Sequence, residues 1–544
     1  MTDWWNKSIE WTRGNHRGEV GREKSMLRVR TARRVSMGLC RFMSAIAAAA
    51  LTLVTACTVG PNYVRPAAEI PGAYKEVEGW KVAQPKDHLT RGAWWEIFDD
   101  PQLNALEEQA NISNQSVMVA EAQFRQARAL VQAARANYFP TVTVGASYTR
   151  SRASANVGGV TGTTVASPTP TSNYMLVADA SWEPDLWGRV RRTVEASKAA
   201  AQASAADLES TRLLVQAELA QDYFLLRVLD GQKQLLDETV VAFQKSLELT
   251  TNRYAAGVAS KGDVFLADTQ LKVTQAQAID VGVLRAQLEH AIASLIGKPA
   301  SLFSIPVAPL AAVPPGVPVG VPSELLERRP DIAGAERRVA AANAQIGVAE
   351  AAYYPTVTLS ASGGFDSSSL SKWFAWPSRF WSVGPGISET VFDGGLRRAQ
   401  TTAARAAYDG TIASYRQTVL TGFQEVEDNL AALRILNEES KVQDEAVKAA
   451  KQSLAVALNQ YKAGTINYLT VIVVQAATLN NEITALGILA RRMTAATLLI
   501  KALVGGWDAS TLPWAKDLGR KDPKQSQSTE SKPLPVDLPS ANTP

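Results

Sequence analysis

An internal repeat constrains the fold of this chain more than any other feature. Three short segments recur along the sequence at nearly one spacing. The pairs are 138–144 with 354–359, 254–257 with 461–464, and 295–297 with 503–505. The offset is 215 residues for the shared proline of the first pair, and 207 and 208 residues for the other two pairs. The sequence therefore predicts two copies of one unit, at 104–299 and 323–507.

Two stretches outside the repeats differ from them in composition. Between the copies, the segment 300–322 holds six prolines from Pro306 onward, which is typical of a semi-rigid extended linker. The tail 508–544 is rich in Ser, Lys and Pro and is predicted to be disordered.

The N-terminus has the pattern of an export signal. Basic residues are followed by a short apolar run that ends in Val54-Thr55-Ala56-Cys57, which is too short for a membrane span of about 20 residues. We predict a signal peptide over 1–56, with 1–25 a possible misassigned start. The last four residues resemble a bacterial lipobox, which implies lipidation (palmitate) of Cys57 and a lipidated segment over 57–103. A plain cleavage site with an incidental cysteine is the alternative.

The composition argues against a catalytic or nucleic-acid-binding protein. The net charge is only +4, the chain has two cysteines and three histidines, and both cysteines precede position 58. Nucleotide-binding, serine-hydrolase and zinc-protease motifs are missing from the sequence. We therefore predict no enzyme activity, no catalytic residues, no metal site, no nucleic-acid partner, and no cofactor apart from a covalent lipid on Cys57.

Each repeat carries an alternating segment that is typical of β-strands. In 141–149 apolar residues alternate with small polar ones, and 356–362 follows the same pattern. Second strands are predicted at about 174–187 and 379–392. Aromatic residues near the predicted strand ends suit a membrane interface. They are Tyr148, Tyr174, Trp182, Trp187, Trp373, Trp376 and Trp381. An apolar face opposite a polar face suits a membrane β-barrel, and a soluble hairpin with one buried face is the alternative. Four strands cannot close a barrel, so this interpretation needs an oligomer.

Very long helices are predicted after the strands. The segment 188–254 has no proline and a seven-residue apolar repeat, and 396–461 is its counterpart. Each ends at a glycine, Gly257 or Gly464, and a return helix follows at 262–297 or 468–505. Shorter Ala-rich helices precede the strands at about 120–137 and 339–352. No segment after the signal is predicted to be a transmembrane helix.

At this point the chain resembles the outer-membrane factor family of tripartite efflux and type I secretion systems (TolC/OprM-like, in the NodT-type lipoprotein branch). The segments 57–66, 94–103, 182–189 and 326–332 carry the resemblance, which covers 57–507. The implied fold is a mixed α and β membrane protein. Its two tandem repeats give four strands of a trimeric twelve-stranded outer-membrane β-barrel, a long periplasmic α-helical coiled-coil barrel and an equatorial belt.

The resemblance also implies two sites near the turns between long helices. The adaptor-docking tips are Gly257, Val258, Ala259, Ser260, Gly464, Thr465, Ile466 and Asn467. The periplasmic aperture is matched by Asp263, Leu469, Thr470 and Val473. Relatives often carry carboxylates where Thr470 and Val473 stand, so we expect a chiefly apolar aperture. Helix capping at the glycines, and helix packing by Leu469 and Val473, are the structural alternatives.

The predicted function is that of an outer-membrane efflux channel that conducts small molecules passively. The implied partners are two further copies in a homotrimer, a periplasmic membrane-fusion adaptor protein, an inner-membrane transporter of the RND type, and outer-membrane lipid. A type I protein-secretion conduit and a non-conducting periplasmic coiled-coil scaffold lipoprotein are the alternatives. The predicted location is the outer membrane, lipid-anchored and spanning, with a projection into the periplasm.

Overall fold

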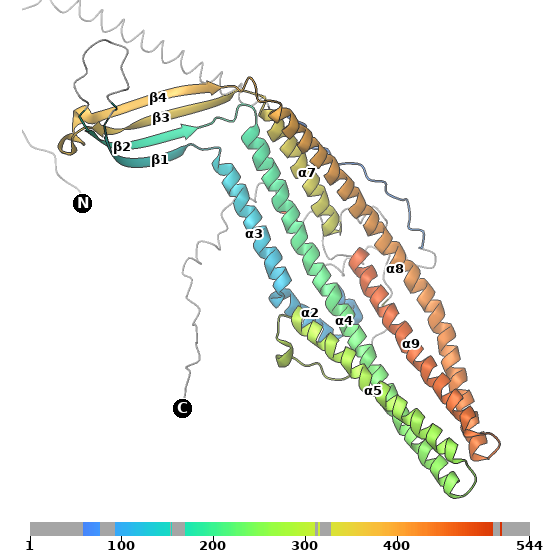
Figure 1. The fold of residues 1–544 in the computed structure, drawn as a ribbon. Coiled ribbons are helices and arrows are strands. Elements are labelled where there is room, and N and C mark those ends of the chain that lie inside the picture. Colours follow the sequence, from blue (N-terminus) through green and yellow to red (C-terminus); the bar gives the residue numbers. More distant parts are fainter. Residues whose placement is uncertain are drawn as a thin grey trace, which may run out of the picture.

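The computed structural model describes residues 58–76, 93–152, 154, 169–310, 314–315, 328–503 and 512–513. The predicted signal peptide, Cys57, residues 311–313 and 316–322 of the linker 300–322, and most of the tail 508–544 lie outside these ranges. The chain is elongated, with a small sheet at one end and a rod of long helices that extends away from it (Figure 1). The two helical turns lie at the far end of the rod.

One antiparallel sheet contains strands from both repeats. Its order is β1 (Thr141–Ser151), β2 (Thr171–Trp182), β3 (Thr356–Ser367) and β4 (Arg379–Ser388). Strands β2 and β3 pair directly, with Ala180 opposite Ala361, so the two repeats share one sheet. The predicted strand regions are confirmed, and the join between repeats lies at the centre of the sheet.

The predicted ends of the second strands were wrong. Strand β2 stops at Trp182 because Pro184 has no N–H for a ladder, and the Asp185 carboxylate accepts the first N–H groups of the next helix. Strand β4 stops at Ser388, and the backbone then turns so that Asp393 caps the helix after it. Trp187 is therefore not a strand-end aromatic residue. It stacks on Tyr354 with ring centroids 4.9 Å apart.

Two 67-residue helices form the rod, α4 (Arg189–Ala255) and α8 (Leu396–Lys462). At about 1.5 Å per residue each spans on the order of 100 Å. The return helices are α5 (Lys261–Leu295) and α9 (Tyr468–Leu503), which pack mainly on α4 and α8 respectively. The predicted heptad positions of α4 are buried in its middle section. These are Leu219, Leu226, Leu229, Leu236 and Phe243.

Shorter helices surround the upper and middle rod. Helices α3 (Gln115–Ala136) and α7 (Pro330–Ala351) lead into β1 and β3, and both begin earlier than the sequence pattern predicts. Helix α2 (Pro101–Ser113) crosses the boundary placed between 103 and 104. Single 3₁₀ turns are η2 (Trp94–Phe98), η3 (Ala300–Leu302), η5 (Leu370–Lys372) and η6 (Trp376–Ser378).

A buried ionic cluster fixes the start of the inter-repeat segment against the rod. Asp230 on α4 is 1% exposed, and it pairs with Arg227 at 3.1 Å and with Arg285 at 2.7 Å. Both arginines also donate to backbone carbonyls of this segment, Arg227 to Pro306 and Arg285 to Ile305. Each buried charge has several hydrogen-bond or ion-pair partners, which offset its desolvation penalty. These contacts fix the inter-repeat segment against the middle of the rod.

Among the described residues, one helix is long and apolar enough to cross a bilayer by length and composition alone. It is α9, and 39% of its most apolar stretch is buried inside the chain. This helix packs along α8 and α4, and residues such as Met493 and Leu499 are fully buried there. Apolar side chains of α9 therefore pack against the neighbouring helices.

Candidate functional site

The sheet has one apolar and one polar face. Cross-strand partners lie on the same face, so the register joins alternate residues of all four strands. The apolar face carries Val142, Val144, Ala146 and Tyr148 of β1, Tyr174, Leu176, Ala178, Ala180 and Trp182 of β2, Val357, Leu359, Ala361, Gly363 and Phe365 of β3, and Trp381, Val383, Pro385 and Ile387 of β4.

This apolar face has no cover within the described residues. Val144 is 73% exposed, Trp381 81% and Ile387 75%. The opposite face carries mostly Thr, Ser, Gly and Asp side chains. A soluble hairpin would bury its apolar side, so the exposed apolar surface indicates contact with lipid on one face and with water on the other.

Aromatic side chains gather at the end of the sheet that is far from the helices. Tyr148 and Tyr174 lie 4.8 Å apart, and Tyr174 lies 5.8 Å from Trp373. The Arg379 guanidinium lies 3.5 Å from the centre of the Trp376 ring. Rings beside polar groups favour the boundary between hydrocarbon and water.

The two helical turns have the same backbone geometry. Gly257 has a φ of 74° and Gly464 a φ of 78°, in the left-handed region that glycine adopts at little cost. The next N–H in each turn bonds back to the long helix. Val258 donates to the Arg253 carbonyl at 2.8 Å, and Thr465 donates to the Gln460 carbonyl at 3.0 Å. These are helix C-caps, as one alternative proposed, and Val258 is nevertheless 65% exposed at the end of the rod.

The predicted aperture residues begin the return helices just after these turns. Asp263 and Ser260 form a capping box, in which the Asp263 carboxylate accepts the Ser260 N–H at 3.0 Å. In the second repeat Asn467 takes the capping role, and its side-chain oxygen accepts the Thr470 N–H at 3.1 Å. The carboxylate of Asp263 is thus occupied in part by helix capping.

The two apolar aperture residues are not used in packing inside one copy. Leu469 is 53% exposed and Val473 is 60% exposed on the first turns of α9. The neighbouring Tyr468 and Val471 face the interior at 2% and 0% exposure. More than half of each of these two side chains is therefore exposed within one copy of the chain.

A contact that the sequence pattern does not reveal joins the two turns. Arg253, near the end of α4, donates to the carbonyl oxygens of Tyr461 at 2.7 Å and of Lys462 at 3.1 Å, and it lies 4.6 Å from the centre of the Tyr461 ring. One sequence feature points to this contact. At the repeat offset of 207, Arg253 corresponds to Gln460, so the two repeats carry different residues at this position.

A buried polar layer lies next to that contact. The Tyr461 hydroxyl donates to the Thr250 hydroxyl at 3.3 Å, and Gln475 donates to Ser246 at 3.2 Å. Tyr468 packs on Tyr461 with centroids 5.2 Å apart, and burial raises the pKa of Tyr468 to about 12. Hydroxyl and amide groups of this layer therefore connect α4 with α8 and α9.

The segment after Cys57 is fixed where the sheet meets the helices. The Val59 N–H donates to the Trp187 carbonyl at 3.1 Å. The buried Arg192 of α4 donates to the carbonyls of Val59 and Gly60 and to the Asn62 side chain. The backbone of Gly60 also lies against Gly347 of α7. Residue 58 therefore lies at the boundary between the sheet and the rod.

Within the described ranges no group of three or more His, Cys, Asp or Glu side chains is close enough to hold a metal ion. Asp185 and Asp393, which the sequence places at equivalent turns, each bind backbone N–H groups at the start of a long helix. Their role is capping.

The comparisons with known proteins agree with this architecture. The outer membrane efflux protein family matches over residues 106–298 and 321–505. Outer membrane protein OprJ of Pseudomonas aeruginosa is 32% identical over 467 residues, 84% of this chain and 95% of the relative. Toluene efflux pump outer membrane protein TtgC of Pseudomonas putida is 30% identical over 84% of this chain and 94% of its own length.

Solved structures show the same fold. The outer-membrane channel OprN superimposes with a TM-score of 0.76 at 32% identity, which covers 83% of this chain and all of that one. The channel CusC gives a TM-score of 0.73 at 25% identity and covers 82% of this chain and 99% of the other. These likenesses cover both repeats, the sheet and the rod. The chain belongs to the outer membrane efflux protein family.

Proposed function

We propose that three copies of this chain close into one conduit through the outer membrane, which serves as the exit duct of an efflux pump. The sheet crosses the membrane, and the helical rod extends into the periplasm. Transport through it is passive, and the residues at the turns serve gating and docking. The relatives are components of channels and efflux pumps, which supports a role in transport over one in catalysis.

The four-stranded sheet with an uncovered apolar face is the single observation that carries this proposal. Strands β1 and β4 are its edges and, within the described residues, neither has a second neighbour. Open edges are not tolerated in hydrocarbon. The strands alternate in direction, so β1 and β4 run oppositely and the β4 edge of one copy fits the β1 edge of the next. Three copies continue the antiparallel order around a closed ring.

Cysteine cross-linking tests this closure. Residues 58–544 contain no cysteine, so introduced pairs are unambiguous. Thr143→Cys on β1 is combined in turn with Ser382→Cys, Gly384→Cys or Gly386→Cys on β4. Within one copy these strands are separated by two others, on the order of 14 Å, which is too far for a disulfide. We expect oxidation to give covalent trimers for at least one pair.

The control places the second cysteine at Ser362 on β3, away from the edge. It is expected to stay monomeric in denaturing gels under the same oxidation. If all three β1–β4 pairs stay monomeric, the closed trimer is wrong. A non-conducting scaffold is then the better description, and bilayers that contain the protein should carry no single-channel current.

The helical turns are the proposed contact with the rest of the pump. Both turns expose small side chains and backbone at the far end of the rod, which suits close approach of a helical hairpin from a periplasmic adaptor. The proposed docking residues are Gly257, Val258, Ala259, Ser260, Gly464, Thr465, Ile466 and Asn467. An RND-type transporter in the inner membrane is the proposed source of cargo.

The exposed Leu469 and Val473 are the proposed aperture together with Asp263 and Thr470. In a threefold ring, apolar side chains close a pore by excluding water, and carboxylates bind cations. Because Asp263 is engaged in its capping box, we expect conductance of the trimer to depend weakly on millimolar divalent cations. Strong divalent block that disappears in Asp263→Asn would contradict an apolar closure.

Anchoring by lipid on Cys57 is also proposed. The position of Thr58 beside Gly188, at the junction of sheet and rod, supports it, because a lipid on the preceding residue is then close to the proposed membrane surface. Mass spectrometry of the mature N-terminus of the wild type and of Cys57→Ser tests this. The cargo we propose is small organic molecules, since one relative is named a toluene efflux component and another an antibiotic efflux component.

A further inference from the structure

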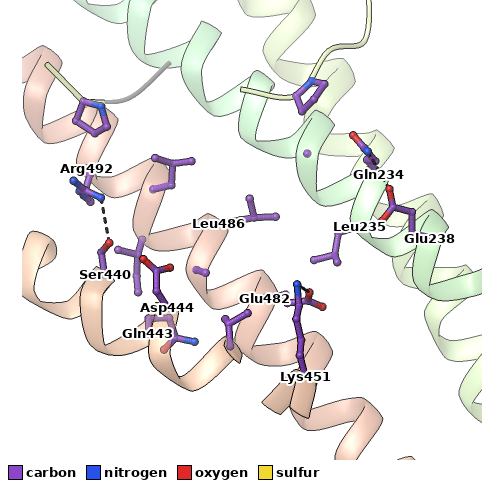
Figure 2. A pocket seen from close by; sticks show the side chains of 17 residues that line it. Gln234, Leu235, Glu238, Ser440, Gln443, Asp444, Lys451, Glu482, Leu486 and Arg492 are labelled. Atoms are coloured by element: carbon purple, nitrogen blue, oxygen red, sulfur yellow. Dashed lines mark hydrogen bonds and ion pairs between the residues drawn. The ribbon is translucent and has the colours of Figure 1, made fainter. Parts of the chain in front are cut away.

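A groove lies between the two hairpins of the rod. Helix α4 forms one wall, α8 forms the other, and α9 lies between them (Figure 2). Pro309 and Pro314 of the inter-repeat segment also line it. Its volume is about 610 Å³, which is within the range of small-molecule sites of roughly 300–1,000 Å³.

Apolar side chains form part of the groove lining. Leu235 of α4, Val447 of α8, and Leu486 and Leu489 of α9 line it, and all four are only half-buried. Side chains that stay partly exposed in a concave surface gain free energy when an apolar molecule covers them. The groove therefore favours a ligand with an apolar part.

Two carboxylates make the rim negative. Glu238 lies on the α4 wall and Asp444 on the α8 wall, and among the described residues neither has an ion-pair partner. Of the two basic groups in the lining, Lys451 pairs with Glu482 at 2.7 Å. Arg492 donates to the neutral Ser440 hydroxyl at 3.2 Å and keeps its positive charge, so the three carboxylates and two basic groups of the lining leave an excess of one negative charge.

We propose that this groove binds amphipathic organic cations of drug size. The ligand's apolar part covers the leucines of α9, and its positive charge lies beside one of the two rim carboxylates, Glu238 or Asp444. The carboxylates of the lining set the sign of the ligand's charge, because they attract a cation and disfavour an anion of the same shape. The site lies on the wall of the rod, away from the aperture residues, and a bound molecule contacts both hairpins.

Equilibrium binding of a fluorescent cation tests the proposal. Full-length protein in lipid nanodiscs is titrated with rhodamine 6G at low ionic strength, and fluorescence anisotropy gives the Kd. Fluorescein, an anion with the same ring core, is the comparison ligand. We expect Glu238→Gln and Asp444→Asn each to raise the Kd for rhodamine 6G about threefold, and the double variant to raise it about tenfold.

Two further variants separate the groove from bulk charge and from misfolding. The double variant Glu248→Gln with Glu438→Gln removes the same charge from exposed positions of α4 and α8 that do not line the groove, and it should bind as the wild type does. Leu486→Trp fills the groove and should abolish saturable binding, while the oligomer on size exclusion stays unchanged.

The proposal is overturned if the Glu238→Gln/Asp444→Asn variant binds rhodamine 6G with the wild-type Kd. It is equally overturned if the matched control loses affinity to the same extent, or if fluorescein binds as tightly as rhodamine 6G. No transport measurement enters the test. A failure here therefore leaves the conduit proposal standing, and failure of the β1–β4 cross-links leaves this site testable.

Discussion

Arg253 is predicted to hold the two turns of the rod together, and Arg253→Gln tests it. The replacement is the residue that the second repeat carries at the corresponding position. It removes two hydrogen bonds to the carbonyls of Tyr461 and Lys462 and the contact with the Tyr461 ring.

The size of the effect can be worked from these contacts. Two charge-assisted bonds at a half-exposed site contribute about 1 kcal/mol each, and the cation–π contact adds about 0.5–1 kcal/mol. The buried Nε of Arg253 has no hydrogen-bond partner among the described residues, so the wild type carries a desolvation penalty there. The substitution removes that penalty, which offsets part of the lost stability. The net loss of local stability is about 2 kcal/mol, or about a thirtyfold change in an opening equilibrium.

Amide hydrogen exchange read by mass spectrometry measures that equilibrium. Peptides that cover 458–468 should exchange about thirtyfold faster in Arg253→Gln, and peptides from the middle of α4 should not change. Lys462→Gln is the control, because it removes a positive charge from the same turn without the contacts. If exchange over 458–468 changes less than twofold, Arg253 does not join the turns and the reasoning fails.

Three further predictions concern helix α2, the rod and the sheet. The buried Glu107 has no hydrogen-bond partner among the described residues, and burial raises its pKa well above the usual value. Above about pH 4.5 the unfolded chain ionises this carboxyl while the folded protein keeps it neutral, so stability falls as pH rises, and the melting temperature of the wild type should fall between pH 5 and pH 8 more steeply than that of Glu107→Gln. Gly347→Ala places a Cβ 2.9 Å from the buried Arg192 side chain of α4 and should lower the free energy of unfolding by about 1–3 kcal/mol. Gly410→Ala has open space around it and should raise that free energy by up to about 1 kcal/mol, and thermal unfolding measures both. Val144→Arg puts a charge on the apolar face, which should cost about 2–4 kcal/mol of folding free energy in the membrane and reduce the yield of folded protein. Thr143→Arg on the polar face should give the wild-type yield, and equal yields for the two variants would argue against lipid contact.

The sequence alone determined the repeats, the helix lengths and the two-faced strands. The seven-residue pattern through Leu219 and Leu226 and the alternation around Val142 are local, because backbone geometry sets the period of each element. The turns at Gly257 and Gly464 could be predicted for the same reason, since a left-handed residue at a helix end favours glycine.

Only the tertiary structure decided the contacts between elements. The ends of β2 and β4 depend on where capping by Asp185 and Asp393 replaces the strand ladder. The burial of Glu107 and the reach of Arg253 to residues 208 and 209 positions away depend on how the hairpins pack. Periodicity records which face of an element is apolar. It does not record which distant residue that face meets, because sequence separation does not set spatial distance.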